Sequence, residues 1–349
     1  MVLNTATHAQ RIVMHRAGSG PVHWSGDGKL VSSGGKIAGG PSLPTSDLRW
    51  SPAGERAAFT TKGGGVELWS PGTGVKRVAP DGFGAQSVAW TSPTRLAIGR
   101  SVCHVPCGNP TSRGIWTWNG RRLTRTVDAS AIDGFPVPFG VDSQGATLWW
   151  AWPNSGSLAA DGVGLYANDR RIASMLMYPD WVAHCGSRLA LAVGGDRNSL
   201  SGKSIELGGR DVSKDTSRSW NSPACSRNGT LLVASATSNS TGPWGHFRVH
   251  RSLWRLLPTR KRLTTPPRGW TDESPVVLPN GSILFVRTRQ LSRKINDAWW
   301  EFDHGTLELL QGGRITPLAR LDFSANELNG AYLQYYGHYE WPTRIAVKP

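Results

Sequence analysis

The sequence predicts an all-β fold built from repeats, and three observations carry that prediction. A hairpin phrase recurs along the chain; its clearest copy is residues 48–60, LRWSPAGERAAFT, and weaker copies start near residues 87, 139, 181, 223 and 275. The starts lie about 40–50 residues apart, a period typical of propeller blades or solenoid units. Glycine (42 residues) and proline (23 residues) separate short apolar runs, a pattern of short strands and turns. No stretch keeps a 3.6-residue apolar period, so we expect little helix.

Each hairpin continues in the same order, with a loop, a third strand, a turn and a fourth strand. One turn, Asn119-Gly120, is a strong two-residue hairpin signal, because both central residues need positive φ. Each repeat is therefore expected to be a four-stranded antiparallel meander, the blade of a β-propeller. The third and fourth strands are expected at 66–70 and 75–79, 114–118 and 122–125, 164–167 and 171–174, 204–207 and 211–213, 252–256 and 261–264, and 307–310 and 315–319.

The two ends of the chain are expected to supply a further blade. Residues 21–34 resemble the third and fourth strands of the first repeat, and residues 331–336 and 344–347 offer the first and second. A blade shared by both termini closes the fold and removes exposed sheet edges. We therefore favour seven blades, with six blades and extra terminal strands as the alternative, in a single propeller domain over residues 1–349. Residues 1–20 are expected to be an irregular N-terminal extension, and the protein a monomer.

The hairpin at residues 50–59, followed by residues 67–69 (ELW), resembles the TolB-type, WD-repeat-like β-propeller repeat. The resemblance covers nearly the whole chain and is sharpest in the first repeat; elsewhere Val141, Cys225 and Val277 replace the first-strand tryptophan. It implies the propeller fold and a tendency to bind proteins or ligands on one face. In the family pattern the glycine serves the turn and the aromatic residues serve the core, so no catalytic residue carries over.

Four cysteines, Cys103, Cys107, Cys185 and Cys225, are expected to form two disulfides. Cys103 and Cys107 close a tiny loop, whereas Cys185 and Cys225 fall at nearly the same place in consecutive repeats. Free thiols are the alternative for both pairs, because a disulfide requires Cα atoms closer than about 7 Å. Disulfides indicate an oxidising compartment, so we expect an extracellular or cell-envelope protein. The residues after Met1 lack a secretory signal, which leaves the cytoplasm as the alternative.

The chain is strongly basic, with 39 Lys and Arg against 24 Asp and Glu and a formal charge of +15. An arginine-rich surface suits anionic partners such as acidic polysaccharide, nucleic acid or anionic lipid. The alternative is a charge spread thinly over the blades by the codon usage of a GC-rich genome. We expect a protein or an anionic cell-envelope polymer as the partner, with nucleic acid less favoured. No apolar run is long enough for a transmembrane helix.

The connections between second and third strands are long, at 101–113, 153–163, 194–203, 236–251 and 290–306, and long loops commonly carry function. In a propeller these connections share one face. Their mixture of aromatic, basic and acidic side chains predicts a ligand site that combines stacking with charge recognition. The alternative for residues 293–305 is an insertion whose tryptophans pack on its own blade. The candidate ligand-binding residues are His104, Trp244, His246, Arg293, Trp299, Trp300, Glu301, Asp303 and His304.

A second candidate site is a basic patch within residues 246–268. Alternation along a strand is expected to place its charges on one exposed sheet face, available to phosphate or sulfate groups. The alternative is an ordinary solvated outer face. The basic-patch residues are Arg248, Arg251, Arg255, Arg260, Lys261 and Arg262.

Catalytic motifs are scarce in this sequence. It has no His-Glu-x-x-His, no EF-hand-type calcium loop and no Gly-x-Ser-x-Gly elbow, and the segment 103–107 lacks a second ligand pair at zinc spacing. Residues 202–204 (GKS) are rejected as a phosphate loop because a strand is expected to follow. We expect no metal and no cofactor, and predict a non-enzymatic binding module that acts through the long-loop face. The alternative is a glycan lyase or hydrolase at the mouth of the central channel. Such a site would use His104, His246, Asp303 and His304.

Overall fold

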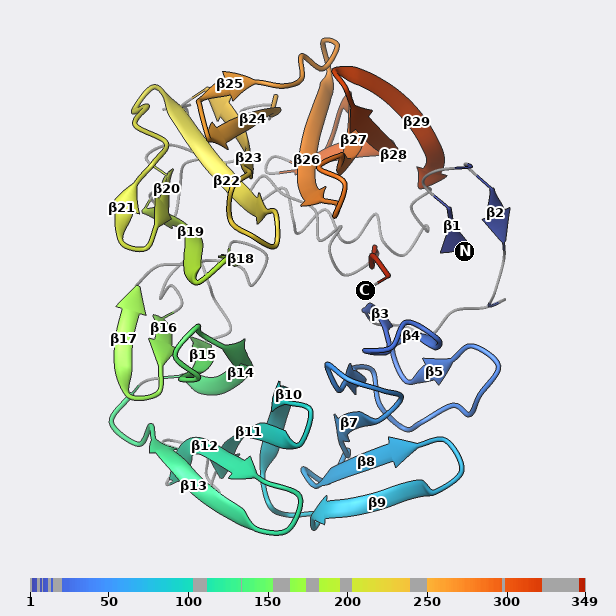
Figure 1. Cartoon of the computed structure of the whole chain (residues 1–349), viewed down its shortest axis with the longest axis vertical. Coiled ribbons are helices and arrows are strands. Elements are labelled where there is room, and N and C mark those ends of the chain that lie inside the picture. Colours follow the sequence, from blue (N-terminus) through green and yellow to red (C-terminus); the bar gives the residue numbers. More distant parts are fainter. Residues whose placement is uncertain are drawn as a thin grey trace. The chain divides into compact units, whose positions relative to one another are not determined.

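The computed structural model describes residues 2–4, 7, 9–11, 14, 21–102, 112–132, 134–152, 164–173, 182–194, 203–238, 250–296, 299–321 and 345–348, with the backbone alone for strand residues between 290 and 304. In this part of the chain all regular structure is β-strand, and no helix is present (Figure 1). The strands form seven sheets of three or four strands and one separate pair. The fold is the predicted all-β propeller of antiparallel blades, and the seven sheets agree with seven blades.

The chain forms two compact units, and each is described by itself. Unit 1 comprises Met1–Leu3, Gln10–Ser174 and Pro342–Pro349, and unit 2 comprises Asn4–Ala9 and Met175–Trp341. The expectation of a single domain stays a prediction. Among the described residues, none belongs to a helix long and apolar enough to cross a membrane.

Unit 1 contains one strand pair, one three-stranded sheet and three four-stranded sheets, all antiparallel and in chain order. The pair is β1 (Val2–Leu3) with β2 (Gln10–Arg11), and the three-stranded sheet is β3 (Val22–Trp24), β4 (Val31–Ser33) and β5 (Lys36–Ile37). The four-stranded sheets are β6 (Arg49–Trp50), β7 (Ala57–Thr60), β8 (Val66–Ser70) and β9 (Gly74–Ala79); β10 (Ala85–Ser92), β11 (Arg95–Val102), β12 (Ser112–Trp118) and β13 (Leu123–Asp128); and β14 (Phe135–Val141), β15 (Thr147–Trp152), β16 (Gly164–Ala167) and β17 (Arg170–Ala173).

Unit 2 contains three four-stranded sheets with the same strand order. They are β18 (Val182–Cys185), β19 (Arg188–Gly194), β20 (Lys203–Leu207) and β21 (Arg210–Asp211); β22 (Arg218–Cys225), β23 (Leu232–Ser238), β24 (Ser252–Leu257) and β25 (Lys261–Arg262); and β26 (Trp270–Val277), β27 (Ile283–Asn296), β28 (Trp299–Gln311) and β29 (Arg314–Leu321).

The first hairpin of a sheet is fixed by a turn that the sequence repeats. Between β6 and β7 the Ser51 amide donates to the Arg56 carbonyl at 2.8 Å. Within that turn Gly54 has a φ of +76°, a conformation that glycine adopts without a steric penalty. The first hairpin of the β22–β25 sheet has the same backbone bond, from Ser226 to Leu231 at 2.9 Å. The recurring phrase is therefore a turn signal, as predicted.

The β3–β4 hairpin uses this turn as well. The Ser25 amide donates to the Leu30 carbonyl at 2.8 Å, the same bond as in the first hairpins of the β6–β9 and β22–β25 sheets. Residues 21–34 thus form the first and second strands of their sheet, and the prediction that they form the third and fourth is wrong. The cause is local, because WSGDGK at residues 24–29 repeats the turn chemistry of WSPAGE at residues 50–55.

The described end of the chain lies against the same sheet. The indole Nε1 of Trp24 on β3 donates to the carbonyl of Ala346 at 3.2 Å, and Lys348 Nζ lies 5.9 Å from the Trp24 ring centroid. Both ends of the chain therefore meet in unit 1, in keeping with a blade that they share. The predicted tail strand at 331–336 lies outside the described residues. The strand predicted at 344–347 is wrong, because the described residues 345–348 form no strand.

The core lies between successive sheets, where apolar side chains interdigitate. In unit 1, Leu68 of the β6–β9 sheet packs in one buried cluster with Val88, Trp90 and Ile98 of the next sheet. The Trp90 indole donates to the Arg49 carbonyl at 2.8 Å, so its polar atom is satisfied on burial. Every four-stranded sheet also buries one aliphatic residue at the same point of its third strand. These residues are Val66, Ile115, Leu165, Ile205, Leu253 and Leu307.

Candidate functional site

The predicted loop-face residues fall in two groups. His104, Trp244 and His246 lie outside the described residues. The others lie on the β27–β28 hairpin, where Trp300 pairs with Lys294 and Trp299 with Asn296. The segment 290–306 is therefore mostly strand, and its prediction as a loop is wrong. Its alternating sequence with few turn residues favours strand extension over a loop. The strand residues concerned are Arg293, Trp299, Trp300, Glu301, Asp303 and His304.

The predicted basic patch is divided by the structure. Arg260, Lys261 and Arg262 are exposed and Arg255 is half-buried, whereas Arg248 lies outside the described residues. Arg251 is only 1% exposed, so its assignment to an exposed face is wrong. It lies immediately before β24, where the third strand enters the packed layer between sheets.

Arg251 is the centre of a buried polar cluster in unit 2. One guanidinium nitrogen lies 3.7 Å from Glu273 Oε2, and both side chains are 1% exposed. With the Asn221 amide turned so that its oxygen faces Arg251, that oxygen accepts from Arg251 Nε at 3.2 Å and from Nη2 at 3.0 Å. The Arg251 amide donates to Thr271 Oγ1 at 3.0 Å. These contacts connect the start of β24 with β22 and β26.

Lys203 is a second buried cation of this cluster. It is the first residue of β20 and is 2% exposed. Burial, with a further contribution from the charge of Arg251, lowers the pKa of Lys203 to about 7. The amine is therefore partly neutral near physiological pH and able to exchange a proton there.

Lys203 and Arg251 occupy the same position of the repeat. Each lies two residues before the buried aliphatic residue of its third strand, Ile205 and Leu253 respectively, and each follows a second-to-third-strand connection. In unit 1 the equivalent position holds Arg113, which is 5% exposed and donates to the Ile132 carbonyl at 2.7 Å. The signal in the sequence is a cation two residues before the first apolar residue of a third strand. This signal is hard to recognise in the sequence, because each such cation follows a connection of different length and sequence.

A hydrogen-bonded ion pair lies on the neighbouring sheet. Arg287 of β27 donates from Nε and Nη2 to the two carboxylate oxygens of Asp272 on β26, at 2.7 and 2.9 Å. The two residues are direct cross-strand partners, and Asp272 is fully buried. Burial raises the pKa of Glu308 on β28, against the opposing effect of Arg287. This two-point pairing compensates the charge of Asp272 inside the sheet.

Two serines beside the cluster carry unused hydroxyl groups. Ser222 and Ser274 are the residues that follow Asn221 and Glu273, and each precedes a proline at a break in strand register. Their φ angles are +45° and +52°, which a non-glycine residue adopts rarely. Both hydroxyls are buried and have no hydrogen-bond partner among the described residues. Strained residues with unused polar groups are more common at binding sites than elsewhere.

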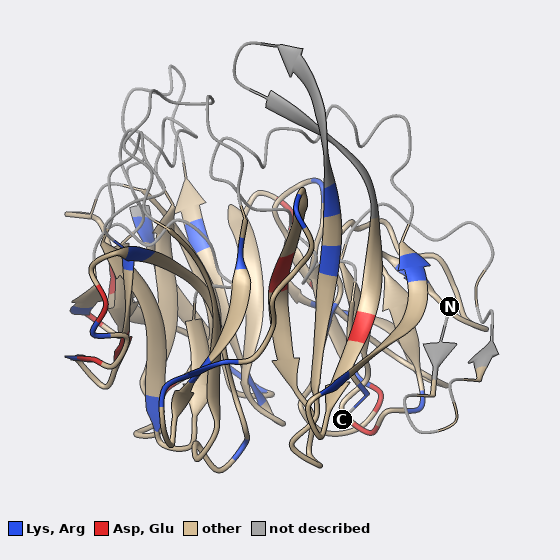
Figure 2. Ribbon diagram, turned by 90° about the horizontal axis from the view of Figure 1, so that it is seen from above, with Lys and Arg blue, Asp and Glu red and all other residues tan. Residues whose placement is uncertain are grey.

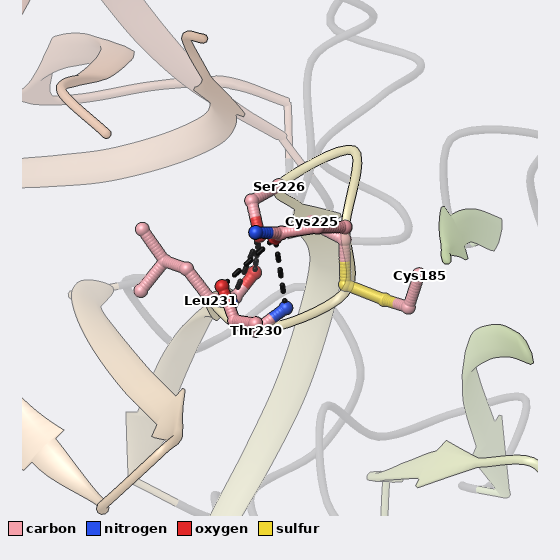
Figure 3. Close-up of a disulfide and its surroundings, with 6 residues drawn as sticks. Cys185, Cys225, Ser226, Thr230 and Leu231 are labelled. Atoms are coloured by element: carbon pink, nitrogen blue, oxygen red, sulfur yellow. Dashed lines mark hydrogen bonds between the residues drawn. A yellow bond between two sulfur atoms is a disulfide. The ribbon is translucent and has the colours of Figure 1, made fainter. Parts of the chain in front are cut away.

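One predicted disulfide is present in unit 2. Cys185 ends β18 and Cys225 ends β22, with their Cα atoms 5.2 Å apart (Figure 3). The bond joins equivalent turns of consecutive sheets, as the repeat spacing predicted. The second predicted pair, Cys103 and Cys107, lies outside the described residues. Within the described ranges, no three His, Cys, Asp or Glu side chains gather in a metal-binding arrangement.

Comparison with known proteins bears on the fold. No protein family and no curated protein matches the sequence. Dipeptidyl peptidase 4 of Porphyromonas gingivalis matches the structure with a TM-score of 0.51 and 12% identity, over 82% of this chain and 46% of that one. A putative TolB from Agrobacterium tumefaciens matches with a TM-score of 0.37 and 13% identity, over 92% and 87% of the two chains. The WD40 repeats of RRP9 match with a TM-score of 0.42 and 10% identity, over 83% and 93%.

These identities are low enough that the likeness concerns the fold alone. The chain spans less than half the length of the dipeptidyl peptidase. The class of the protein is thus a β-propeller of antiparallel blades, as the repeated hairpin phrase predicted. A scaffold of this class is suited to binding.

Proposed function

We propose that this protein is a non-enzymatic binding module that recognises an anionic group, of a protein or of a cell-envelope polymer, at the face of the second-to-third-strand connections. The observation that carries the proposal is the pair of buried cations in unit 2. Lys203 and Arg251 stand where two such connections enter adjacent sheets.

The physical argument concerns the cost of that arrangement. Two cations close together disfavour each other's charged form, and the charge of Arg251 contributes to the lowered pKa of Lys203. The low dielectric around them also strengthens their field at the nearby surface. An anion at this end of the sheets would be attracted by that field. The unused hydroxyls of Ser222 and Ser274 are further hydrogen-bond donors beside the cluster.

The proposed location is outside the cell or in its envelope. The support is the bond between Cys185 and Cys225, since structural disulfides are rare in reducing compartments.

The test is binding of a fluorescent polyglutamate peptide, followed by fluorescence anisotropy. Lys203→Met is expected to weaken binding about tenfold at pH 6, because a charge in a low-dielectric setting is removed. In the wild-type protein the affinity is expected to fall as the pH rises through 7, where Lys203 loses its proton. The matched control is Lys62→Met, which removes one exposed positive charge from unit 1. Equal affinity of the two variants would reject the proposal.

A second candidate function, that of a glycan lyase, is favoured by one observation. An amine with a pKa of about 7 is matched to proton abstraction near neutral pH, and Lys203 has such a pKa beside the cationic Arg251. The assay is incubation with polygalacturonate while the absorbance of the unsaturated uronate product is followed. Turnover that is lost in Lys203→Met would establish the lyase. If no product forms at any pH between 6 and 9, the lyase is rejected and the binding module remains the proposed function.

A further inference from the structure

The fourth strands carry a repeated feature that is separate from the cluster around Arg251. Each of the six four-stranded sheets has exposed Lys or Arg within two residues of the start of its fourth strand. In unit 1 these residues are Lys76, Arg121, Arg122, Arg125, Arg170 and Arg171. In unit 2 they are Arg210, Arg260, Lys261, Arg262 and Arg314. Figure 2 shows Lys and Arg positions on strands and turns of both units.

In unit 1 these cations lie at one end of three consecutive sheets. The three sheets pack face to face, because one buried cluster joins the first to the second and another joins the second to the third. The first turns of the first two sheets lie at the same end, since the Arg56 guanidinium donates to the Pro93 carbonyl of the next sheet. The third sheet has the same orientation, because the Ser87 hydroxyl near the start of β10 donates to the Pro136 carbonyl near the start of β14. In an antiparallel meander the turn before the fourth strand lies at the same end as the first turn. The cations therefore form one row across the unit.

Most of these cations in unit 1 have no acidic partner. Among the described residues, no ion pair includes Lys76, Arg121, Arg122, Arg170 or Arg171, and we call these five residues the outer-hairpin row. Arg125, at the same place in its sheet, does have an acidic partner, because it pairs with Asp128, and Arg49 on β6 lies 2.8 Å from Asp47. A row of unpaired exposed cations attracts polyanions and releases their counterions on binding.

We propose that the outer-hairpin row of unit 1 is a binding surface for an acidic polysaccharide. Neighbouring sheets pack about 10 Å apart, so three sheets spread the row over about 20 Å, the reach of a chain with several acidic sugars. Four of the five residues are arginine, whose planar guanidinium pairs with carboxylate or sulfate through two parallel hydrogen bonds. This surface does not depend on the proposed loop-face site.

The surroundings of the row favour polysaccharide over other polyanions. The large hydrophobic residues exposed among those described are Val75 and Val347, and neither is aromatic. Single-stranded nucleic acid is bound largely by stacking of bases on aromatic side chains, and membrane-surface binding uses apolar side chains buried in the lipid. Charge pairing alone suits a sugar polymer whose negative groups repeat along the chain.

The experiment compares two variants of equal charge. In the first, Arg121, Arg122, Arg170 and Arg171 are replaced by glutamine; in the second, the exposed Lys62, Arg188, Arg227 and Arg268 are replaced by glutamine. Binding of heparin and of polygalacturonate is measured at several salt concentrations. We expect the first variant to bind about tenfold or more weakly, because contacts to sulfate or carboxylate groups are lost. Its salt dependence is expected to be flatter, because fewer counterions are released on binding. The second variant is expected to remain near the wild-type affinity.

Three results would overturn the proposal. One is equal affinity of the two variants, which would show that binding depends on the net charge of the protein and not on the position of the row. Another is stronger binding of duplex DNA or of phosphatidylserine vesicles than of either polysaccharide. The third is aggregation of the first variant with undiminished polysaccharide binding, because charges on sheet edges also prevent strand pairing between molecules. Lys203→Met is expected to keep polysaccharide binding at the row, so failure of the loop-face proposal is distinguishable from failure of this one.

Discussion

Two arginine–glutamate pairs have the same separation in different surroundings. Arg251 and Glu273 in unit 2 lie 3.7 Å apart with both side chains 1% exposed, and Arg77 and Glu67 in unit 1 lie 3.7 Å apart with side chains 60% and 17% exposed. The first arginine stands at the start of a third strand, inside the packed layer between sheets. The second stands on a fourth strand, at the edge. Position within the blade thus decides whether a cation is held in the packed interior or stands at the surface.

The largest expected loss in the free energy of unfolding comes from breaking the buried pair of Arg251 and Glu273. Arg251→Met leaves Glu273 without its guanidinium partner, and removal of one member of a buried pair costs about 3–5 kcal/mol. Urea unfolding followed by tryptophan fluorescence measures the loss in the free energy of unfolding. The double variant Arg251→Met with Glu273→Gln is expected to recover part of it, because the uncompensated carboxylate is gone. A loss below about 1 kcal/mol in the single variant would contradict the assigned role.

An intermediate effect is expected in the pH dependence of stability. The pKa of Lys203 is about 7 in the folded protein and 10.5 for an ordinary lysine, so between these values the unfolded chain holds a proton that the folded protein lacks. The free energy of unfolding therefore rises with pH across this window, by up to about 1.4 kcal/mol per pH unit for this group. Below pH 7 its contribution is constant. Urea unfolding of wild type and Lys203→Met from pH 6 to 9 isolates it; parallel curves would show an unshifted lysine.

The smallest effect is expected for the exposed pair. Arg77→Met removes a partner at the same 3.7 Å separation, yet exposed ion pairs contribute about 0–1 kcal/mol. The expected change in the free energy of unfolding is therefore under 1 kcal/mol, by the same urea assay. A loss as large as that of Arg251→Met would remove the distinction between the two strand positions.

The blades are readable in the sequence because their turns are chemically explicit. Ser51 and Gly54 fix a turn that recurs in the first hairpins of the β3–β5 and β22–β25 sheets, and the repeat spacing correctly predicted the bond between Cys185 and Cys225. The prediction failed at residues 21–34, because a first hairpin and the hairpin of the third and fourth strands have similar sequences. It failed again at residues 290–306, because length alone does not separate a loop from an extended hairpin.

The candidate site was less predictable than the fold. The burial of Arg251 depends on residues of two other strands, Asn221 and Glu273, that are distant in sequence. A period-two pattern assigns a charged residue to the exposed face by default, and only the packing of sheets reverses this. The shared position of Lys203 and Arg251 becomes visible once the third strands are aligned on their buried aliphatic residues.

The turns joined by the disulfide lie backbone against backbone. A side chain placed on Gly229 would lie 2.7 Å from the Cys185 carbonyl, and one on Gly186 would lie 3.2 Å from the Asn228 carbonyl. Both glycines also have positive φ, at +73° and +62°. The two cysteines and the two glycines are therefore expected to change together in evolution. Exchange of either glycine for a larger residue would push the two turns apart, and Cys185 and Cys225 could then no longer approach each other closely enough to bond.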